Sequence, residues 1–133
     1  MGAYVADQVS KLMYKKKIHV GDAKVLIMGF AFKENCTDYR NTRVVDLYEQ
    51  FKSFDCNIDI YDPWIDKGLA YSEYNIKLID KPKIHYYDVI VIAVAHNEFK
   101  ALSEKQIRTY GKDKHILYDI KYLLKSSESD GRL

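Results

Sequence analysis

The sequence predicts an α/β fold in which helices cover both faces of a doubly wound parallel sheet. Four short apolar runs, rich in β-branched residues and bounded by turn residues, have the character of strands. Two of them are apolar almost throughout, which is typical of strands in the middle of a parallel sheet. Between the runs the apolar period changes to that of a helix. This alternation indicates a Rossmann-like, three-layer architecture with right-handed crossovers, and the 133 residues fit a single domain.

The predicted strands follow one another along the chain with helical or polar segments between them. They are VLIMGF at 25–30, IDIY at 58–61, DVIVIAVA at 88–95 and HILYDI at 115–120. The segment 64–87 has a weaker pattern, in which LAYSEYNIKLI favours a short helix and a minor strand at 76–79.

A helix is predicted directly after the loop that follows the first strand. Val44, Leu47 and Phe51 are spaced so that they share one face of a helix. Asn41 or Thr42 is suited to be its N-cap, because a short polar side chain there can accept a hydrogen bond from a free backbone amide.

The N-terminal segment 1–20 has the pattern of a helix that has lost its beginning. An apolar stripe of Val5, Val9, Leu12 and Met13 starts directly after Met1-Gly2, with no cap before it. We therefore expect a truncated helix, the end of a central linker helix, whose stripe lacks its native partners. Such a helix would either fray or mediate self-association.

Residues 21–125 are then expected to form the domain itself. The last residues, 126–133, are small and polar, and the sequence predicts that they are a disordered tail.

The composition excludes several classes of function. The formal net charge of +2 is spread along the chain, which argues against nucleic-acid binding. Neither cysteine has a metal-site spacing, so no metal is expected, and two unpaired thiols are typical of a reduced, cytoplasmic protein. The longest apolar run, 89–95, is too short to cross a membrane, so no membrane association is expected.

The loop after the first strand gathers positive charge where ligands of open parallel sheets bind. Lys33, Arg40 and Arg43 lie between the carboxyl end of that strand and the next helix, whose N-terminus also favours an anion. Long side chains would have to hold a phosphate, because Gly29 is not followed by the further glycines of a dinucleotide-binding turn. The alternative is that these cations are solvated and paired with Glu34, Asp38 and Asp46, and the pattern alone does not decide.

Two residues that end later strands are further candidates. Asp62 could hold a ribose hydroxyl, although its distance from Gly29 exceeds the roughly 20 residues of the standard unit, and Asp62-Pro63 is first of all a turn. His96 could line a nucleotide cleft, although Asn97 as the N-cap of a helix also explains this pair.

The remaining candidates have an equally ordinary alternative. Tyr61 and Trp64 could stack on a base, but aromatic residues beside a strand end are more often part of the core. Lys121 could contact a phosphate or could be a solvated loop residue. Cys56 resembles a small buried hydrophobic residue, and basic neighbours could make Cys36 more reactive.

Several blocks in order, GFAFKENCTDYRNTRVVDLYEQF, IDIYDPWID, VIVIAVAHNEF, YDIK and SDGRL, resemble the C-terminal domain of the UDP-glucose/GDP-mannose dehydrogenase family. The forms KENC, RNT and DPW are most similar to the UDP-N-acetyl-hexosamine 6-dehydrogenase branch, which makes uronic acids for capsules and other surface polysaccharides. The resemblance implies an oxidoreductase whose N-terminal Rossmann domain binds NAD, whose central region carries the catalytic cysteine, and whose C-terminal domain binds the UDP-sugar.

The resemblance also implies roles for individual residues. Phe32 and Lys33 would contact the substrate, and Arg40 would meet the pyrophosphate of NAD, with Arg43, His96 and Asp62 as further candidates. The family oxidises a primary alcohol to a carboxylate in two hydride transfers through a thiohemiacetal. Neither Cys36 nor Cys56 lies in the block that carries the family's nucleophile, so no catalytic residue is assigned.

The chain is therefore expected to be inactive alone. Its partners would be a UDP-sugar and the rest of the same polypeptide, and the full-length enzyme would be a homodimer or a higher oligomer. A free-standing nucleotide-binding or regulatory module remains the alternative. A phosphoacceptor domain does not fit, because the expected aspartates are absent from the ends of the first and central strands.

Overall fold

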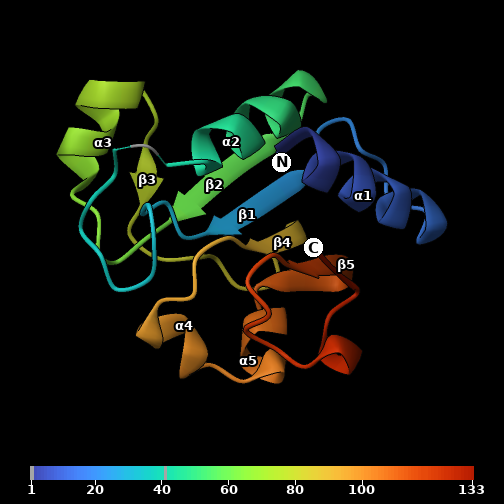
Figure 1. Cartoon of the computed structure of the whole chain (residues 1–133). Coiled ribbons are helices and arrows are strands. Elements are labelled where there is room, and N and C mark those ends of the chain that lie inside the picture. Colours follow the sequence, from blue (N-terminus) through green and yellow to red (C-terminus); the bar gives the residue numbers. More distant parts are fainter. Residues whose placement is uncertain (1, 41) are drawn as a thin grey trace.

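Six parallel strands form one sheet between two layers of helices in a computed structural model that describes residues 2–40 and 42–133 (Figure 1). The helices are α1 Gly2–Lys15, α2 Val44–Ser53, α3 Lys67–Tyr74, α4 Asn97–Lys100, α5 Glu104–Arg108 and the 3₁₀ helix η1 Ser126–Glu128. The strands are β1 Lys24–Met28, β2 Asn57–Tyr61, β3 Leu78–Ile79, β4 Tyr87–Ile92, β5 Gly111–Asp119 and β6 Gly131–Arg132.

The strand order is β3-β2-β1-β4-β5-β6, which is the order of the dinucleotide-binding Rossmann fold. The chain moves outward from β1 through β2 to β3, then returns to the other side of β1 with β4. The topological switch point therefore lies between β1 and β4, at the middle of the sheet. The predicted fold class is confirmed.

Both faces of the central strands are buried, as the apolar runs predict. Val25 and Ile27 of β1 face a core that α1, α2 and α3 cover, whereas Leu26 and Met28 face a second core that contains α4 and α5. Successive side chains of a strand point to opposite faces, so a strand buried on both sides must be apolar throughout.

The predicted minor strand is confirmed in a shorter form. Within segment 64–87, α3 is followed by the two-residue strand β3, which pairs with β2. Asp66 caps α3, since its side chain accepts a hydrogen bond from the Leu69 amide at 3.0 Å.

The N-terminal helix packs on its own domain, contrary to the expectation that its stripe lacks partners. Val5, Val9 and Met13 are completely buried or nearly so, in the core between α1, α2 and the sheet. Figure 1 shows α1 lying beside α2 over the same face of the sheet. The apolar stripe is therefore satisfied within the chain, and neither fraying nor self-association follows from it.

The C-terminal residues 126–133 are ordered, contrary to the expectation of a disordered tail. The Asp130 amide donates to the Leu117 carbonyl at 2.8 Å, and the Leu117 amide donates to Asp130 Oδ2 at 2.7 Å. This pair lies at the start of β6, which adds to the edge of β5. The Asp130 side chain contributes one of the contacts that hold this segment, and hydropathy and composition do not reveal such a contact.

Two helix caps also differ from the predictions. Arg43 occupies the N-cap position of α2 without a side-chain cap bond, while the Thr42 hydroxyl accepts from the Val44 amide at 3.2 Å; Asn41 lies outside the described residues. Asn97 is the first residue of α4 rather than its cap, and His96 occupies the cap position. In the described part of the chain, no helix is long and apolar enough to cross a membrane.

Candidate functional site

A pocket of about 240 Å³ opens at the carboxyl ends of β1, β4 and β5, at the switch point of the sheet. Ligands of open α/β sheets bind at this place. Its lining comes from α1, from the first turn of α2 and from the loops after these three strands: Gly2, Val5, Ala31, Phe32, Arg43, Val44, Leu47, Ala93, Ile120 and Lys121.

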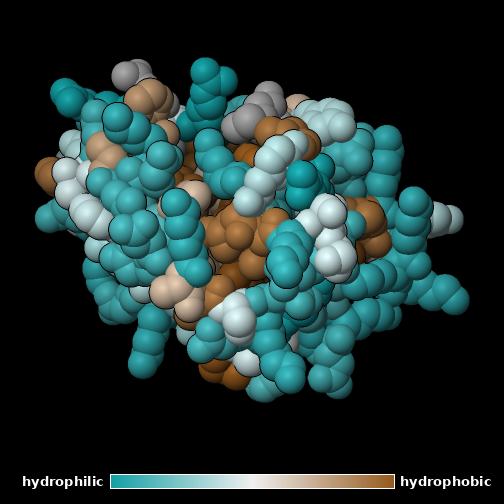
Figure 2. All heavy atoms as spheres, turned by 60° about the horizontal axis from the view of Figure 1, so that its bottom comes forward, coloured by the Kyte–Doolittle hydropathy of each residue, from teal (hydrophilic) through white to brown (hydrophobic). Residues whose placement is uncertain are grey.

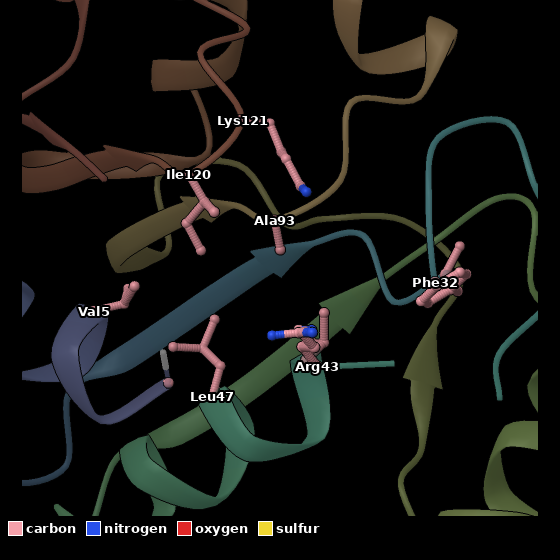
Figure 3. Close-up of a pocket in the computed structure, with 10 residues that line it drawn as sticks. Val5, Phe32, Arg43, Leu47, Ala93, Ile120 and Lys121 are labelled. Carbon is pink, nitrogen blue, oxygen red and sulfur yellow. The ribbon is translucent and has the colours of Figure 1, made fainter. Parts of the chain in front are cut away.

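The pocket combines an apolar floor with two cations. Val5, Leu47 and Ile120 converge on its centre from different elements, while Arg43 and Lys121 carry its positive charge (Figure 3). Lys121 extends its amine toward Ala93 at the end of β4. Figure 2 looks onto a face of the molecule where hydrophobic side chains gather in a hollow that hydrophilic residues surround. Such a site suits a ligand with one apolar, flat part and one anionic part.

Sequence reasoning selected Phe32, Arg43 and Lys121 as candidates, and the structure brings these three together at the pocket. It did not select Val5 or Leu47 as pocket residues. Their helical spacing indicated a buried face, and periodicity cannot distinguish a side chain against a core from one on the floor of a pocket.

Lys33 and Arg40 lie on the same loop, but the lining of the pocket does not include them. Lys33 is exposed. The Arg40 side chain is 75% exposed, and its Nε donates to Asp38 Oδ1 at 3.0 Å. This hydrogen bond lowers the pKa of Asp38. The pairing of Arg40 with Asp38 is the one that the solvated-charge alternative named, whereas Asp46 accepts from the Gly2 amide.

Asp62 and His96 are buried and bonded to each other, so they do not face the pocket. Asp62 Oδ2 accepts from His96 Nε2 at 2.9 Å, from the Phe30 amide at 2.6 Å and from the Ala31 amide at 2.9 Å. Burial alone would raise the pKa of Asp62, but the bonds from His96 and from backbone amides outweigh burial and hold that pKa below its usual value. The polar atoms of both side chains are therefore occupied by contacts within the protein.

The aromatic candidates pack within the protein. The Trp64 ring stacks on the His96 ring with centroids 5.9 Å apart, and its Nε1 donates to Glu98 at 2.9 Å. Tyr61 packs against Phe99, 5.9 Å between ring centroids. These contacts favour the packing role over stacking on a base.

The turn after β1 does not have the form that admits a dinucleotide. Gly29 has φ of +109°, but a Cβ there would meet Val94, so this glycine serves close packing of two loops. The Arg40 guanidinium, on the loop that follows this turn, is exposed and paired with Asp38. A diphosphate would have to share that group with Asp38.

The cysteines have different surroundings. Cys56 is buried, and burial raises the pKa of its thiol to about 11, which keeps it protonated and unreactive. Cys36 is half-buried, and its sulfur accepts from the Asp38 amide at 3.3 Å. Among the described residues, no group of His, Cys, Asp or Glu is arranged to hold a metal ion.

The fold and the pocket at its switch point are those of the α/β domains that bind nucleotides. The chain belongs to the UDP-glucose/GDP-mannose dehydrogenase family, whose UDP binding domain matches residues 26–126. The resemblance inferred from the sequence blocks is confirmed.

Curated relatives agree with the branch that the motifs indicated. Over 133 residues, all of this chain, it is 47% identical to the UDP-N-acetyl-D-glucosamine 6-dehydrogenase of Salmonella typhi and 48% identical to that of Pseudomonas aeruginosa. The chain spans 31% and 32% of the lengths of these relatives, so it corresponds to about a third of such an enzyme.

Solved structures show the same fold at low sequence identity. The NDP-N-acetyl-D-galactosaminuronic acid dehydrogenase of Methanosarcina mazei Go1 matches with a TM-score of 0.84 at 17% identity, over 96% of this chain and 26% of that one. The UDP-D-ManNAc dehydrogenase of Pyrococcus horikoshii matches with a TM-score of 0.76 at 21% identity, over 98% of this chain and 30% of that one.

Proposed function

We propose that this chain is the C-terminal, UDP-sugar-binding part of an NAD-dependent UDP-N-acetyl-hexosamine 6-dehydrogenase that supplies uronic acids for surface polysaccharides. The observation that carries the proposal is the pocket at the switch point, with its apolar floor and with Arg43 and Lys121 beside it. Family membership and the identity to two UDP-N-acetyl-D-glucosamine 6-dehydrogenases support the substrate class.

The groups at the pocket suit the two ends of a uridine diphosphate. The apolar lining to which Leu47 and Ile120 contribute suits the flat base. Arg43 can hold a diphosphate with two parallel hydrogen bonds, and Lys121 adds a point charge. The positive end of the α2 dipole favours an anion in the same place. Phe32 and Lys33 would reach the sugar side of the ligand from the loop after β1.

The rest of the enzyme would supply the remaining functions. NAD, bound mainly by the N-terminal domain of the same polypeptide, would accept the hydrides, and Arg40 would contribute one contact to its pyrophosphate. We expect the full-length enzyme to be a cytoplasmic homodimer or higher oligomer, and the chain alone to give no turnover, because it lacks the family's nucleophilic cysteine block.

Calorimetry of the purified chain tests the proposal. UDP and UDP-N-acetylglucosamine should bind, and GDP-mannose and NAD should bind much more weakly or not at all. Arg43→Ala and Lys121→Ala should each weaken UDP binding by about tenfold, the effect of losing one charge-assisted contact.

Lys105→Ala is the matched control, since Lys105 is an exposed lysine of α5 and does not line the pocket. A wild-type chain that fails to bind UDP would refute the proposal. A loss of binding in the Lys105 variant equal to that in the Lys121 variant would show a nonspecific charge effect and would refute the site.

A further inference from the structure

The loop after β1 is held at two points by one chain of hydrogen bonds, which is buried at the base of the loop and partly buried at its tip. At its base, Asp62 Oδ2 accepts from the amides of Phe30 and Ala31. At its tip, the Asn35 amide donates to His96 Nδ1 at 2.9 Å. His96 Nε2 lies 2.9 Å from Asp62 Oδ2, which links the two anchors.

The hydrogen bonds fix the state of the His96 ring. Because the Asn35 amide donates to Nδ1, that nitrogen presents its lone pair, and the proton is on Nε2, which donates to Asp62. The ring is 0% exposed, so both of its nitrogens are satisfied by protein groups. Trp64 covers one face of the ring.

The tip of the loop has a second bond to the same corner. The Asn35 side chain accepts from the Asn97 amide at 2.9 Å, and Asn35 has a φ of +54°, in the left-handed region that asparagine tolerates well. Residues 35 and 96–97 therefore form a clamp between the loop after β1 and the start of α4.

Phe32 and Lys33 lie between the two anchors of the loop. Phe32 is 51% exposed and lines the pocket, and Lys33 is exposed. Neither side chain is fixed by burial, so their positions depend on the backbone of the loop. An ordered loop presents both side chains to a ligand without the entropy cost of ordering them on binding.

We propose that His96 is a positioning residue for the ligand site: through its Nδ1 bond to Asn35 it fixes the loop tip so that Phe32 and Lys33 are presented at the pocket. This role rests on the proposed function, because it assumes that the ligand is a UDP-sugar. His96 touches neither ligand nor cofactor in this role. A merely structural histidine would join the ends of β2 and β4 through Asp62 without influencing ligand affinity.

Two substitutions separate the two bonds of the ring. In His96→Asn the amide oxygen lies close to the place of Nδ1, so it can still accept from Asn35, but it cannot reach Asp62. In His96→Gln the amide lies close to the place of Nε2, so it can still donate to Asp62, but the Asn35 amide loses its acceptor. Both variants lose part of the ring, so the comparison between them isolates the bond to the loop.

The measurements are amide hydrogen exchange of Asn35 by NMR in the ligand-free chain and calorimetry with UDP-N-acetylglucosamine, whose sugar Phe32 and Lys33 would reach. We expect His96→Gln to exchange the Asn35 amide at least tenfold faster than wild type and to bind UDP-N-acetylglucosamine about three- to tenfold more weakly. His96→Asn should stay within about twofold of wild type in both measurements. Far-UV circular dichroism shows whether each variant is folded, because the fluorescence of Trp64, which stacks on the ring of His96, would respond to the substitution itself.

Equal exchange of Asn35 in the two variants would overturn the proposal. So would fast exchange in His96→Gln with unchanged affinity for UDP-N-acetylglucosamine, since the loop would then be released without effect on the site. If the wild-type chain does not bind UDP, the proposed function fails separately, and the exchange rates still decide whether His96 holds the loop.

Discussion

Gly29 packs so closely against Val94 that a Cβ at position 29 would lie 2.6 Å from the Cβ of Val94 and 2.9 Å from its backbone nitrogen. The two residues follow the neighbouring strands β1 and β4, on the two sides of the switch point. The Val94 amide also donates to the carbonyl of Met28 at 3.3 Å. The two loops beside the pocket thus approach each other through the missing side chain of one glycine.

Gly29→Ala should be strongly destabilising. The φ of +109° is unfavourable for alanine, and the new methyl group would meet backbone that cannot move aside cheaply. The two effects together should cost about 3 kcal/mol of unfolding free energy, which urea denaturation can measure.

Gly68→Ala is the control for the glycine substitution. Gly68 is exposed in α3, where alanine is the better helix former, so the change should stay within about 1 kcal/mol. If the Gly29 variant is as stable as the Gly68 variant, the packing of the two loops is looser than the geometry indicates.

Asp62 should make the stability of the protein sensitive to acid. Its pKa in the folded state is lowered, so its contribution is fully present above the unfolded-state pKa of about 3.9 and is lost as the pH falls through the folded-state value. In Asp62→Asn, one carboxylate oxygen is replaced by an NH₂ group, which cannot accept hydrogen bonds from backbone amides. The substitution should lower the unfolding free energy by about 2 kcal/mol at pH 7.

The difference in unfolding free energy between wild type and Asp62→Asn should therefore become smaller as the pH falls below about 4. Urea denaturation of both proteins at a series of pH values measures this difference. Asp113→Asn, at an exposed position of β5, should match wild type throughout the series. A difference that stays constant down to the acid transition would show that the charge of Asp62 is not the cause.

The core of this fold could be predicted from the sequence because it depends on local periodicity. Apart from Lys24 and Asp88 near their starts, β1 and β4 are apolar, and each is covered on both faces, as the pattern required. Even the two-residue strand β3 was anticipated, because the apolar side chains Ile76 and Leu78 alternate with a polar one.

The features that were missed depend on contacts between distant residues. The clamp of the loop joins Asn35 to His96, 61 positions later, and the strand β6 depends on Asp130, 13 positions after Leu117. Neither bond produces a periodic pattern in the sequence from which it could be predicted. Asparagine tolerates a left-handed turn, but the residue type at position 35 does not reveal which side chain accepts its amide.

Asp130→Ala should release the C-terminal strand. The mutation leaves the Leu117 amide without its 2.7 Å partner and removes the carboxylate that Arg108 Nη1 contacts at 3.2 Å. We expect a loss of about 2 kcal/mol, together with faster amide exchange at Gly131 and Arg132, measured by NMR. Ser127→Ala, at an exposed position of η1, should change neither quantity. Free exchange of residues 131–132 in the wild-type chain would contradict the ordered tail.

The charges of the loop after β1 should act on different ligands in an enzyme that carries this domain. Lys33→Ala should raise the KM for the UDP-sugar by about ten- to a hundredfold, the equivalent of about 1.5–3 kcal/mol for a charge-assisted contact. Arg40→Ala should act mainly on the KM for NAD, because the exposed guanidinium is suited to a diphosphate. Its surface ion pair with Asp38 contributes little to folding, so thermal melts of both variants should match wild type.

The measurement is a pair of steady-state titrations for each variant, with one substrate varied while the other is saturating. Lys105→Ala should leave both KM values unchanged, because it also removes one positive charge but lies on α5, which is not part of the loop after β1. An exchange of the two effects would mean that Arg40 faces the sugar nucleotide and Lys33 the cofactor. If both variants melt like wild type and leave both KM values unchanged, Lys33 and Arg40 are solvated surface charges. Arg40 then only pairs with Asp38.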